Sequence, residues 1–159
     1  MRRLIVPVLA LALGGVAFAR PAAVKWPAWL SIESPVNPFD RDNRGAVLLV
    51  HAMTREGAAP LVAVTGTAEG VVSGQRRSMP IHFDTTATPG VFAVRKQWPS
   101  DGTWLLQISL AQTTAIVVLD RDGSVASVRV PTQLQKGNQI PRGVAAKEID
   151  STLAAAARR

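Results

Sequence analysis

Cysteine and tyrosine are absent from this 159-residue chain, and aromatic residues make up only 5% of it. The lack of cysteine excludes a disulfide-stapled scaffold, an iron–sulfur cluster, a thiolate zinc site, a thiol nucleophile and a lipid-anchoring cysteine. Hydrophobic residues nevertheless account for 47% of the sequence, which is too much for a disordered tail protein. The length is that of one domain, whose stability must come from burial of a hydrophobic core.

The N-terminus combines a basic start with an uncharged run. Arg2 and Arg3 precede sixteen residues without charge, Leu4–Ala19, and small residues occupy the positions that a signal peptidase inspects. This pattern is typical of a secretory signal peptide, and the run is shorter than the roughly 20 apolar residues that span a bilayer. We therefore expect a signal peptide over residues 1–19, cleaved after Ala19, and a location in a bacterial periplasm or outside the cell.

The formal net charge of +7 is carried by the ends of the chain. Residues 26–130 contain nine basic and nine acidic side chains, whereas the signal segment contributes +2, residues 20–25 another +2 and residues 131–159 a further +3. A neutral central region is not the footprint of a nucleic-acid-binding protein, so no nucleic acid is expected as a partner. The basic flanks predict only weak contact with anionic lipid headgroups.

Short runs rich in Val, Ile, Thr and aromatic residues recur about every ten residues through the centre of the chain, separated by turn-forming residues. This pattern predicts an antiparallel all-β domain over residues 26–130. The expected strands are Trp29–Glu33, Gly45–Thr54, Leu61–Glu69, Gln75–Asp84, Gly90–Trp98, Thr103–Ala111, Ala115–Asp120 and Ser124–Val130.

Turn signals and side-chain alternation support this interpretation. Hairpins are suggested where turn residues separate neighbouring strands, at Ser73-Gly74, Pro99–Gly102 and Asp120–Gly123. Alternate residues of a strand point to the same face of a sheet, so two apolar sets are expected to face the interior. These sets are Phe92, Val94 and Trp98 in one run and Trp104, Leu106, Ile108 and Leu110 in the next. The run Gly45–Thr54 is apolar on both faces, which favours a central strand over a buried helix.

The C-terminal part of the chain differs in composition from the centre. Residues 131–143 combine proline and glycine without periodicity, which predicts a linker. Residues 144–159 are rich in alanine, with apolar positions at helical spacing, and predict a C-terminal helix. The apolar stripe of this helix is thin, so docking on the domain and a mobile tail both remain open.

One stretch resembles a known group of domains. Pro89-Gly90-Val91-Phe92 is followed by Gly102-Thr103-Trp104, so that Pro-Gly-x-aromatic precedes Gly-x-Trp. The segment resembles bacterial immunoglobulin-like domains of the export compartment, such as the YtkA-like and FixH-like groups, and the resemblance extends loosely over residues 29–111. It implies an immunoglobulin-like antiparallel β-sandwich, with no particular activity attached to the fold. Together with the composition of residues 144–159, the sequence predicts such a sandwich of roughly seven or eight strands followed by a short C-terminal helix.

Metal binding is one hypothesis that the residues raise. His51, Met53, Met79 and His82 supply imidazole and thioether groups, which are suitable ligands for copper. On a strand, positions 51 and 53 share a face whereas 79 and 82 do not, so at most three of the four could converge without a bulge. The alternative is that both methionines fill the core and both histidines lie on sheet surfaces.

Other candidate sites are weaker. The segment beginning at Asp40-Arg41-Asp42-Asn43 resembles the start of a calcium loop, but it offers too few oxygen ligands, so an Asx-type turn is expected. No nucleophile elbow, phosphate-binding glycine loop or zinc-protease motif occurs in the sequence, and we expect a protein that is not an enzyme.

The tryptophans allow a third hypothesis. Indole rings on an exported domain could stack on sugars, whereas burial would make them core and rim anchors of a sandwich. The four are Trp26, Trp29, Trp98 and Trp104. The sequence thus favours a non-catalytic interaction or accessory domain of the periplasm or cell envelope, without a cofactor, which recognises an envelope protein partner through a sheet edge or loops. A copper-handling domain and a carbohydrate-binding module are the alternatives.

Overall fold

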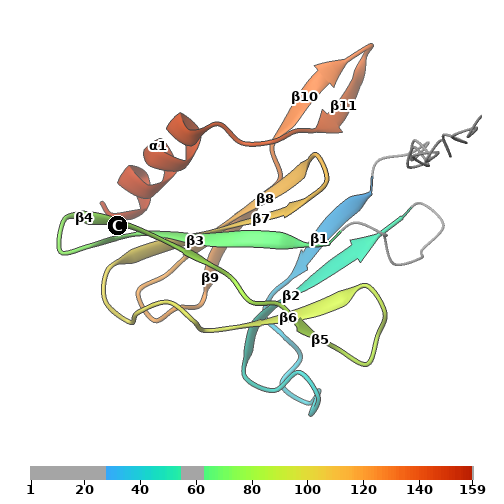
Figure 1. Ribbon diagram of the computed structural model, residues 1–159, viewed down its shortest axis with the longest axis horizontal. Helices are drawn as coiled ribbons and strands as arrows, with labels where there is room; N and C mark the ends of the chain where they lie inside the picture. The colour runs from blue at the N-terminus through green and yellow to red at the C-terminus, as the bar shows by residue number, and fades with distance from the viewer. Residues whose placement is uncertain (1–27, 55–62, 159) are drawn as a thin grey trace, which may run out of the picture.

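Two antiparallel sheets packed face to face form the body of the protein in a computed structural model that describes residues 28–54 and 63–158 (Figure 1). The expected signal peptide, Trp26 and the predicted start of a strand at Leu61 lie outside the described residues. The elements are β1 (Trp29–Glu33), β2 (Ala46–Met53), β3 (Thr65–Val72), β4 (Gln75–Pro80), β5 (Asp84–Thr85), β6 (Val91–Arg95), β7 (Thr103–Leu110), β8 (Thr113–Leu119), β9 (Val125–Arg129), β10 (Thr132–Gln135), β11 (Asn138–Pro141) and α1 (Ala146–Ala156).

The strands are arranged in two sheets and a separate ribbon. One sheet has the order β1-β2-β6-β5, the other has the order β4-β3-β7-β8-β9, and β10 pairs only with β11. The all-β prediction of an antiparallel sandwich with one short C-terminal helix is therefore confirmed. The strand number differs from the expected seven or eight, because eleven strands are present in the described residues and nine of them belong to the two sheets.

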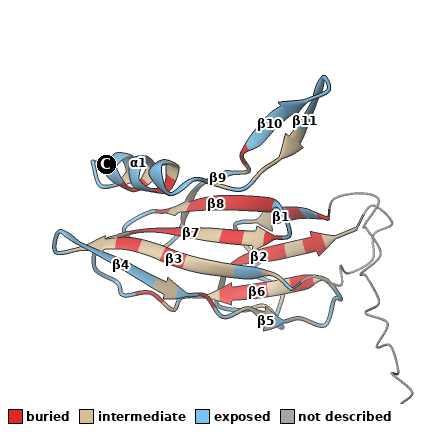
Figure 2. Cartoon of the chain, turned by 45° about the horizontal axis from the view of Figure 1, so that its top comes forward, coloured by how far each residue is buried: buried red, intermediate tan, exposed pale blue. Residues whose placement is uncertain are grey.

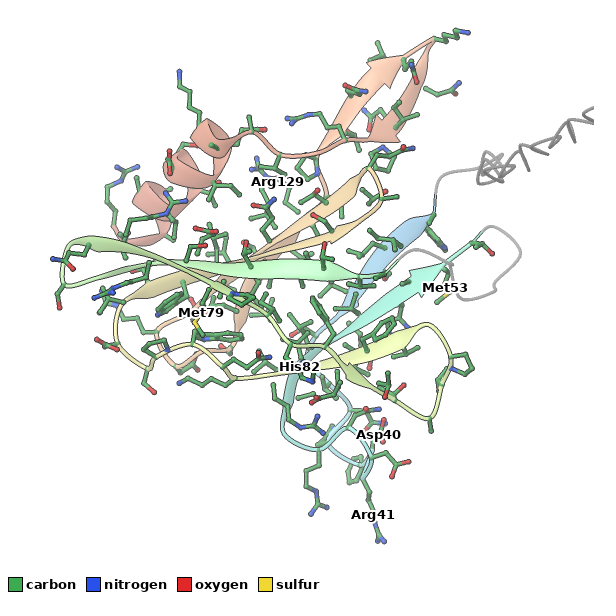
Figure 3. The ribbon with its side chains drawn as sticks, in the orientation of Figure 1. Asp40, Arg41, Met53, Met79, His82 and Arg129 are labelled. Atoms are coloured by element: carbon green, nitrogen blue, oxygen red, sulfur yellow. The ribbon has the colours of Figure 1, made fainter. Side chains whose placement is uncertain are left out.

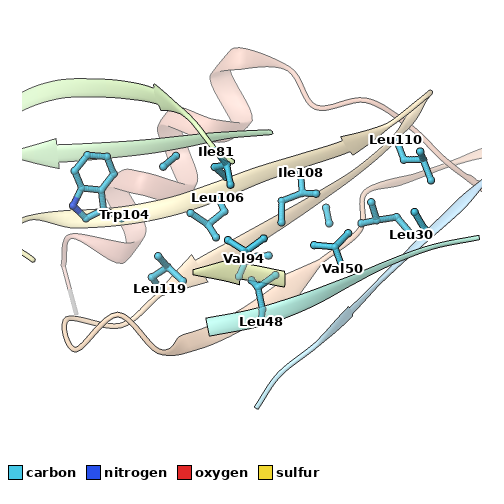
Figure 4. Packing of buried hydrophobic residues seen from close by; sticks show 14 of the residues in the cluster. Leu30, Leu48, Val50, Ile81, Val94, Trp104, Leu106, Ile108, Leu110 and Leu119 are labelled. Carbon is cyan, nitrogen blue, oxygen red and sulfur yellow. The ribbon is translucent and has the colours of Figure 1, made fainter. Parts of the chain in front are cut away.

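Alternation along the strands builds the core between the sheets. Trp104, Leu106, Ile108 and Leu110 of β7 all belong to the main buried cluster, as the sequence predicts, and meet β2 through Leu48 and Val50 (Figure 4). Val94 and Trp98 join the same cluster, although Trp98 follows the end of β6. The run around β2 is central in its sheet, and its other face is covered by a small cluster around Leu49.

Two expected connections differ from the structure. Pro99–Gly102 links β6 in one sheet to β7 in the other, so it is a crossover between sheets and not a hairpin. The predicted strand Gln75–Asp84 is divided into β4 and β5, which also belong to different sheets. Turn-forming residues indicate where the chain changes direction. They do not indicate which sheet the next strand joins, because that depends on packing between the sheets. The turns at Ser73-Gly74 and Asp120–Gly123 do close hairpins, as predicted.

The segment interpreted as a linker is a two-stranded ribbon, here called the arm (Thr132–Pro141). Lys136 and Gly137 have φ of 49° and 81°, values that suit the tight turn of a hairpin with right-handed twist. All four residues of β10 are exposed, and the arm projects away from the sandwich (Figure 2). The sequence predicted a linker over residues 131–143 and did not indicate these two strands, because the arm carries no apolar alternation that would mark a strand.

The C-terminal helix packs against the outer face of the five-stranded sheet, which settles the question that the sequence left open. Ile149 and Leu153 of α1 are buried in a cluster with Leu105 of β7 and Ile116 of β8. An ion pair between Arg76 on β4 and Asp150 on α1 lies at the rim of this contact. Within the part of the chain that the structure describes, no helix is long and apolar enough to cross a membrane.

Candidate functional site

The histidine and methionine of β2 lie near the surface of the four-stranded sheet. His51 Nε2 lies 2.8 Å from Glu33 Oε2 on the neighbouring strand, so the imidazole N–H donates to a carboxylate. Met53 ends the strand opposite Trp29 of β1. The hydrogen bond to Glu33 occupies one ring nitrogen of His51.

The other two candidate ligands lie elsewhere. Met79 on β4 packs against the main core cluster and pairs with Ala68 of the five-stranded sheet. The His82 side chain is 80% exposed, and its Nε2 lies 3.3 Å from Asp84 Oδ1. Met53, Met79 and His82 are well separated (Figure 3). The structure does not bring the four predicted copper ligands together, and no group of three or more His, Asp or Glu suited to a metal occurs among the described residues.

The acidic loop before β2 forms the expected turn. Asp40 Oδ1 accepts hydrogen bonds from the backbone N–H of Asp42 at 3.1 Å, and Asp40 Oδ2 accepts one from Asn43 Nδ2 at 2.7 Å. The Asn43 side-chain hydrogen bond is the main reason why the pKa of Asp40 lies below its ordinary value. The carboxylate oxygens are thus engaged within the loop, which is an Asx-type turn.

The described tryptophans do not form a shared platform. Trp98 and Trp104 are buried in the core, each 4% exposed, and Trp104 Nε1 donates to the Asp101 carbonyl oxygen at 2.8 Å. Trp29 is 58% exposed, and Trp26 lies outside the described residues. Two of the four indoles therefore anchor the sandwich, as expected for core aromatics.

Two strands, β4 and β9, form the edges of the five-stranded sheet, and they differ in chemistry. β4 carries Arg76 and Arg77 and ends at Pro80. Charged side chains and proline are devices by which natural sheets prevent pairing with another chain. β9 has the sequence Val-Ala-Ser-Val-Arg, with one charge at its end and three consecutive exposed residues, Ser127 to Arg129. The open β9 edge is therefore the less protected of the two.

A groove runs beside this edge. It is open to solvent and has a volume of about 590 Å³ between α1 and the strands β8 and β9. The lining residues are Ile116 and Val118 on β8, Ser127, Val128 and Arg129 on β9, and Glu148, Ser151, Thr152, Ala155 and Ala156 on α1. Small side chains on α1 and aliphatic side chains on β8 leave room for a guest between them. The groove and the β9 edge together form the candidate binding site.

Of the charged side chains that line the groove, Glu148 has an ion-pair partner and Arg129 has none among the described residues. Arg142 Nη1 and Nη2 donate to the two carboxylate oxygens of Glu148, both at 2.7 Å, and the Ala145 N–H donates to the same carboxylate at 3.2 Å. These contacts, chiefly the Arg142 hydrogen bonds, lower the pKa of Glu148 from 4.5 to about 2. Arg129 adds only a smaller electrostatic contribution to that shift. Among the described residues, Arg129 forms no ion pair of its own.

None of the groove residues was a candidate on sequence grounds. The sequence does indicate the strand Ser124–Val130, but it does not indicate that this strand lies at the edge of its sheet. The helix wall could not be placed, because whether residues 144–159 dock was open. A groove formed by a strand and a distant helix requires the tertiary structure.

Comparisons with protein-family models, with curated proteins and with solved structures give no match for this chain. The class of protein is therefore defined by its own architecture: an antiparallel β-sandwich with a docked C-terminal helix and an open sheet edge beside a groove.

Proposed function

We propose that this protein is an exported, non-catalytic interaction domain of the periplasm or cell envelope, which binds a partner protein by adding an extended segment of that partner to β9. The observation that carries the proposal is the open β9 edge beside the groove. An edge strand presents unpaired backbone N–H and C=O groups, and addition of a strand is a recurring mode of peptide recognition.

The contrast between the two edges supports the choice of β9. A partner strand approaching β4 would meet Arg76 and Arg77, both exposed, and then Pro80. At β9 it meets small and aliphatic residues along most of the strand. Each backbone hydrogen bond contributes about 0.5–1.5 kcal/mol net, so a short paired segment gives a modest affinity unless side chains add to it. The groove supplies a place for such side chains.

Two further parts of the proposal have independent support. The basic, uncharged and small-residue pattern of residues 1–19 supports export. The two packed antiparallel sheets of four and five strands support an immunoglobulin-like type of sandwich. Stability without cysteine is physically reasonable for a core of this size.

Site-specific photo-cross-linking in intact cells tests this function. A benzophenone amino acid is placed at Ser127 on β9, and a matched variant carries it at Gln75 on β4, an exposed position on the opposite edge of the same sheet. We expect one discrete product from Ser127 that is absent from Gln75, with the cross-linked site of the partner inside one short extended segment. The same set of neighbours from both positions, or a partner site within a helix, would refute strand addition at β9.

A further inference from the structure

The outer face of β9 presents two side chains in a fixed arrangement. Arg129 pairs with Ile116 of β8, and Ser127 pairs with Val118. Residues directly opposite each other in an antiparallel pair share a face, so Ser127 and Arg129 lie on the groove side together with the groove floor. A strand added to β9 would therefore present alternate residues to the groove, and the residues opposite Ser127 and Arg129 are two positions apart whichever direction that strand runs.

Ser127 is a small residue between the open side of β9 and the apolar residues of β8 that form the groove floor. Its side chain is small, whereas Val118 behind it is aliphatic and lines the groove. On the far wall Ala155 and Ala156 are also small. Neighbouring strands are about 4.7–4.9 Å apart, so β8 lies two spacings, about 9–10 Å, from a strand added to β9, and only a long side chain that leans across Ser127 approaches it. A Leu, Met or Phe opposite Ser127 can extend over it to the apolar floor, which a short or charged residue cannot use.

Arg129 gives the neighbouring position the opposite preference. Arg129, labelled in Figure 3, is exposed and lines the groove. It forms no ion pair among the described residues. Glu148 lines the same groove, but Arg142 already holds both of its carboxylate oxygens. An Asp or Glu opposite Arg129 would gain a cross-strand partner, and a Lys or Arg there would meet a like charge.

We propose that the segment bound by β9 is an extended peptide with an acidic residue and a long apolar residue two positions apart, the acidic side chain opposite Arg129 and the apolar side chain opposite Ser127. This inference rests on the proposed function, because it assigns the partner segment for the same edge. Backbone pairing sets the register of the segment, and the groove and Arg129 select its side chains.

Fluorescence anisotropy with defined peptides tests the charge preference. The probes are labelled peptides of nine residues with alternating Thr and Val, carrying either Glu or Lys two positions from a Leu. The purified protein is expected to bind the Glu peptide roughly three- to tenfold more tightly than the Lys peptide, as a cross-strand charge pair implies. Arg129→Glu should reverse the order. Arg121→Glu, which changes the same charge at the β8–β9 turn, should leave the order unchanged.

The apolar preference needs its own pair of variants. Ala155→Leu places a larger side chain in the groove, whereas Ala154→Leu adds the same group at an exposed α1 position that does not line it. The first should weaken binding of the Glu-Leu peptide several-fold and bring it to the level of a Glu-Ala peptide. The second should leave the difference between the two peptides intact.

The possible outcomes separate this inference from the proposed function. Equal affinity for the Glu and Lys peptides, or no binding of any probe up to about 1 mM, overturns the assigned peptide class. If the discrete cross-link from Ser127 persists in that case, the binding function stands and only the assigned segment fails. If that cross-link is also missing, strand addition at β9 fails with it. Reversal by Arg129→Glu together with loss in Ala155→Leu supports the inference.

Discussion

Gly70 of β3 and Trp104 of β7 form a cross-strand pair in which the absence of a side chain on one residue makes room for the indole of the other. An ideal Cβ built on Gly70 would lie 2.4 Å from Trp104 Cε3 and 2.5 Å from Cδ2. The indole is 4% exposed, and its Nε1 is held by the Asp101 carbonyl. Gly70→Ala is therefore expected to destabilise the sandwich.

The size of the effect follows from the overlap. Carbon atoms in contact prefer a separation of about 3.5–4.0 Å, so the ring would have to move by about 1 Å inside a packed core. Overpacking of this kind costs about 1–3 kcal/mol. Alanine would otherwise gain about 0.5–1 kcal/mol over glycine within a strand. We expect a net loss of about 1 kcal/mol in the free energy of unfolding, which lowers Tm by roughly 3–5 °C for a domain of this size.

A double-mutant cycle with Trp104→Leu assigns this cost to the indole. In the Trp104→Leu background, Gly70→Ala should be neutral or slightly stabilising, giving a coupling energy of about 1–2 kcal/mol in urea-unfolding measurements. Gly143→Ala is the control, because a Cβ at Gly143 has no atom within 4 Å. An equal penalty for Gly70→Ala in both backgrounds would show that the reasoning about the Gly70–Trp104 contact is wrong.

Three other regions give separate predictions. Leu153→Ala removes a buried side chain between α1 and the sheet, and we expect the helix docking to lose about 2–5 kcal/mol of stabilising free energy. The helix should then detach from the sheet, which would be measured as faster amide exchange in α1 with exchange in the core strands unchanged. The folded-state pKa of Glu148, about 2, lies below its ordinary value of 4.5, so its stabilising contribution is present above pH 4.5 and is lost as pH falls from there towards 2. Glu148→Gln should therefore weaken the acid dependence of exchange in α1. Replacing most of the arm, residues 133–140, by two glycines should change the free energy of unfolding by less than about 0.5 kcal/mol, because the arm is mostly exposed. The hydrogen bond from the Arg142 N–H to the Pro131 carbonyl oxygen, 3.0 Å long, would still join the two ends of the shortened arm.

Matched measurements make each of these predictions refutable. Ala154→Ser, at an exposed position of α1, should leave helix exchange close to that of the unaltered protein, and equal exchange in Leu153→Ala would contradict the docking role of Leu153. Lys147→Gln should keep the acid dependence that Glu148→Gln loses. Loss of cooperative unfolding after replacement of the arm would mean that the ribbon supports the sandwich.

Local sequence patterns placed most strands of the sandwich correctly. The alternation in β7 was predicted because every second residue of a strand meets the same layer, and Trp104 to Leu110 contains no exception. The turn at Ser73-Gly74 was predictable because both residues adopt positive φ, 49° and 77°, at a two-residue hairpin. The arm was missed, since its strands carry polar residues that packing does not select.

The candidate site depended on contacts that local patterns do not encode. His51, Met53, Met79 and His82 were grouped by chemistry, but the first two lie on one sheet and Met79 packs against the core from the other. Spacing along a strand states which face a residue occupies and leaves open which sheet its strand joins. Grouping these four residues by chemistry alone therefore could not show that the fold places them apart.

The sequence by itself determined the all-β class, the approximate strand limits, the interior faces and the helical C-terminus, because steric preferences and hydrophobic period act over a few neighbouring residues. Only the tertiary structure decided that β9 ends its sheet, that α1 covers the outer face beside it, and that Ser127 and Arg129 border a groove. Strand order and helix docking are set by the joint burial of residues distant in the chain. The candidate binding surface arises at that level, from a strand and a helix that the arm separates in the sequence.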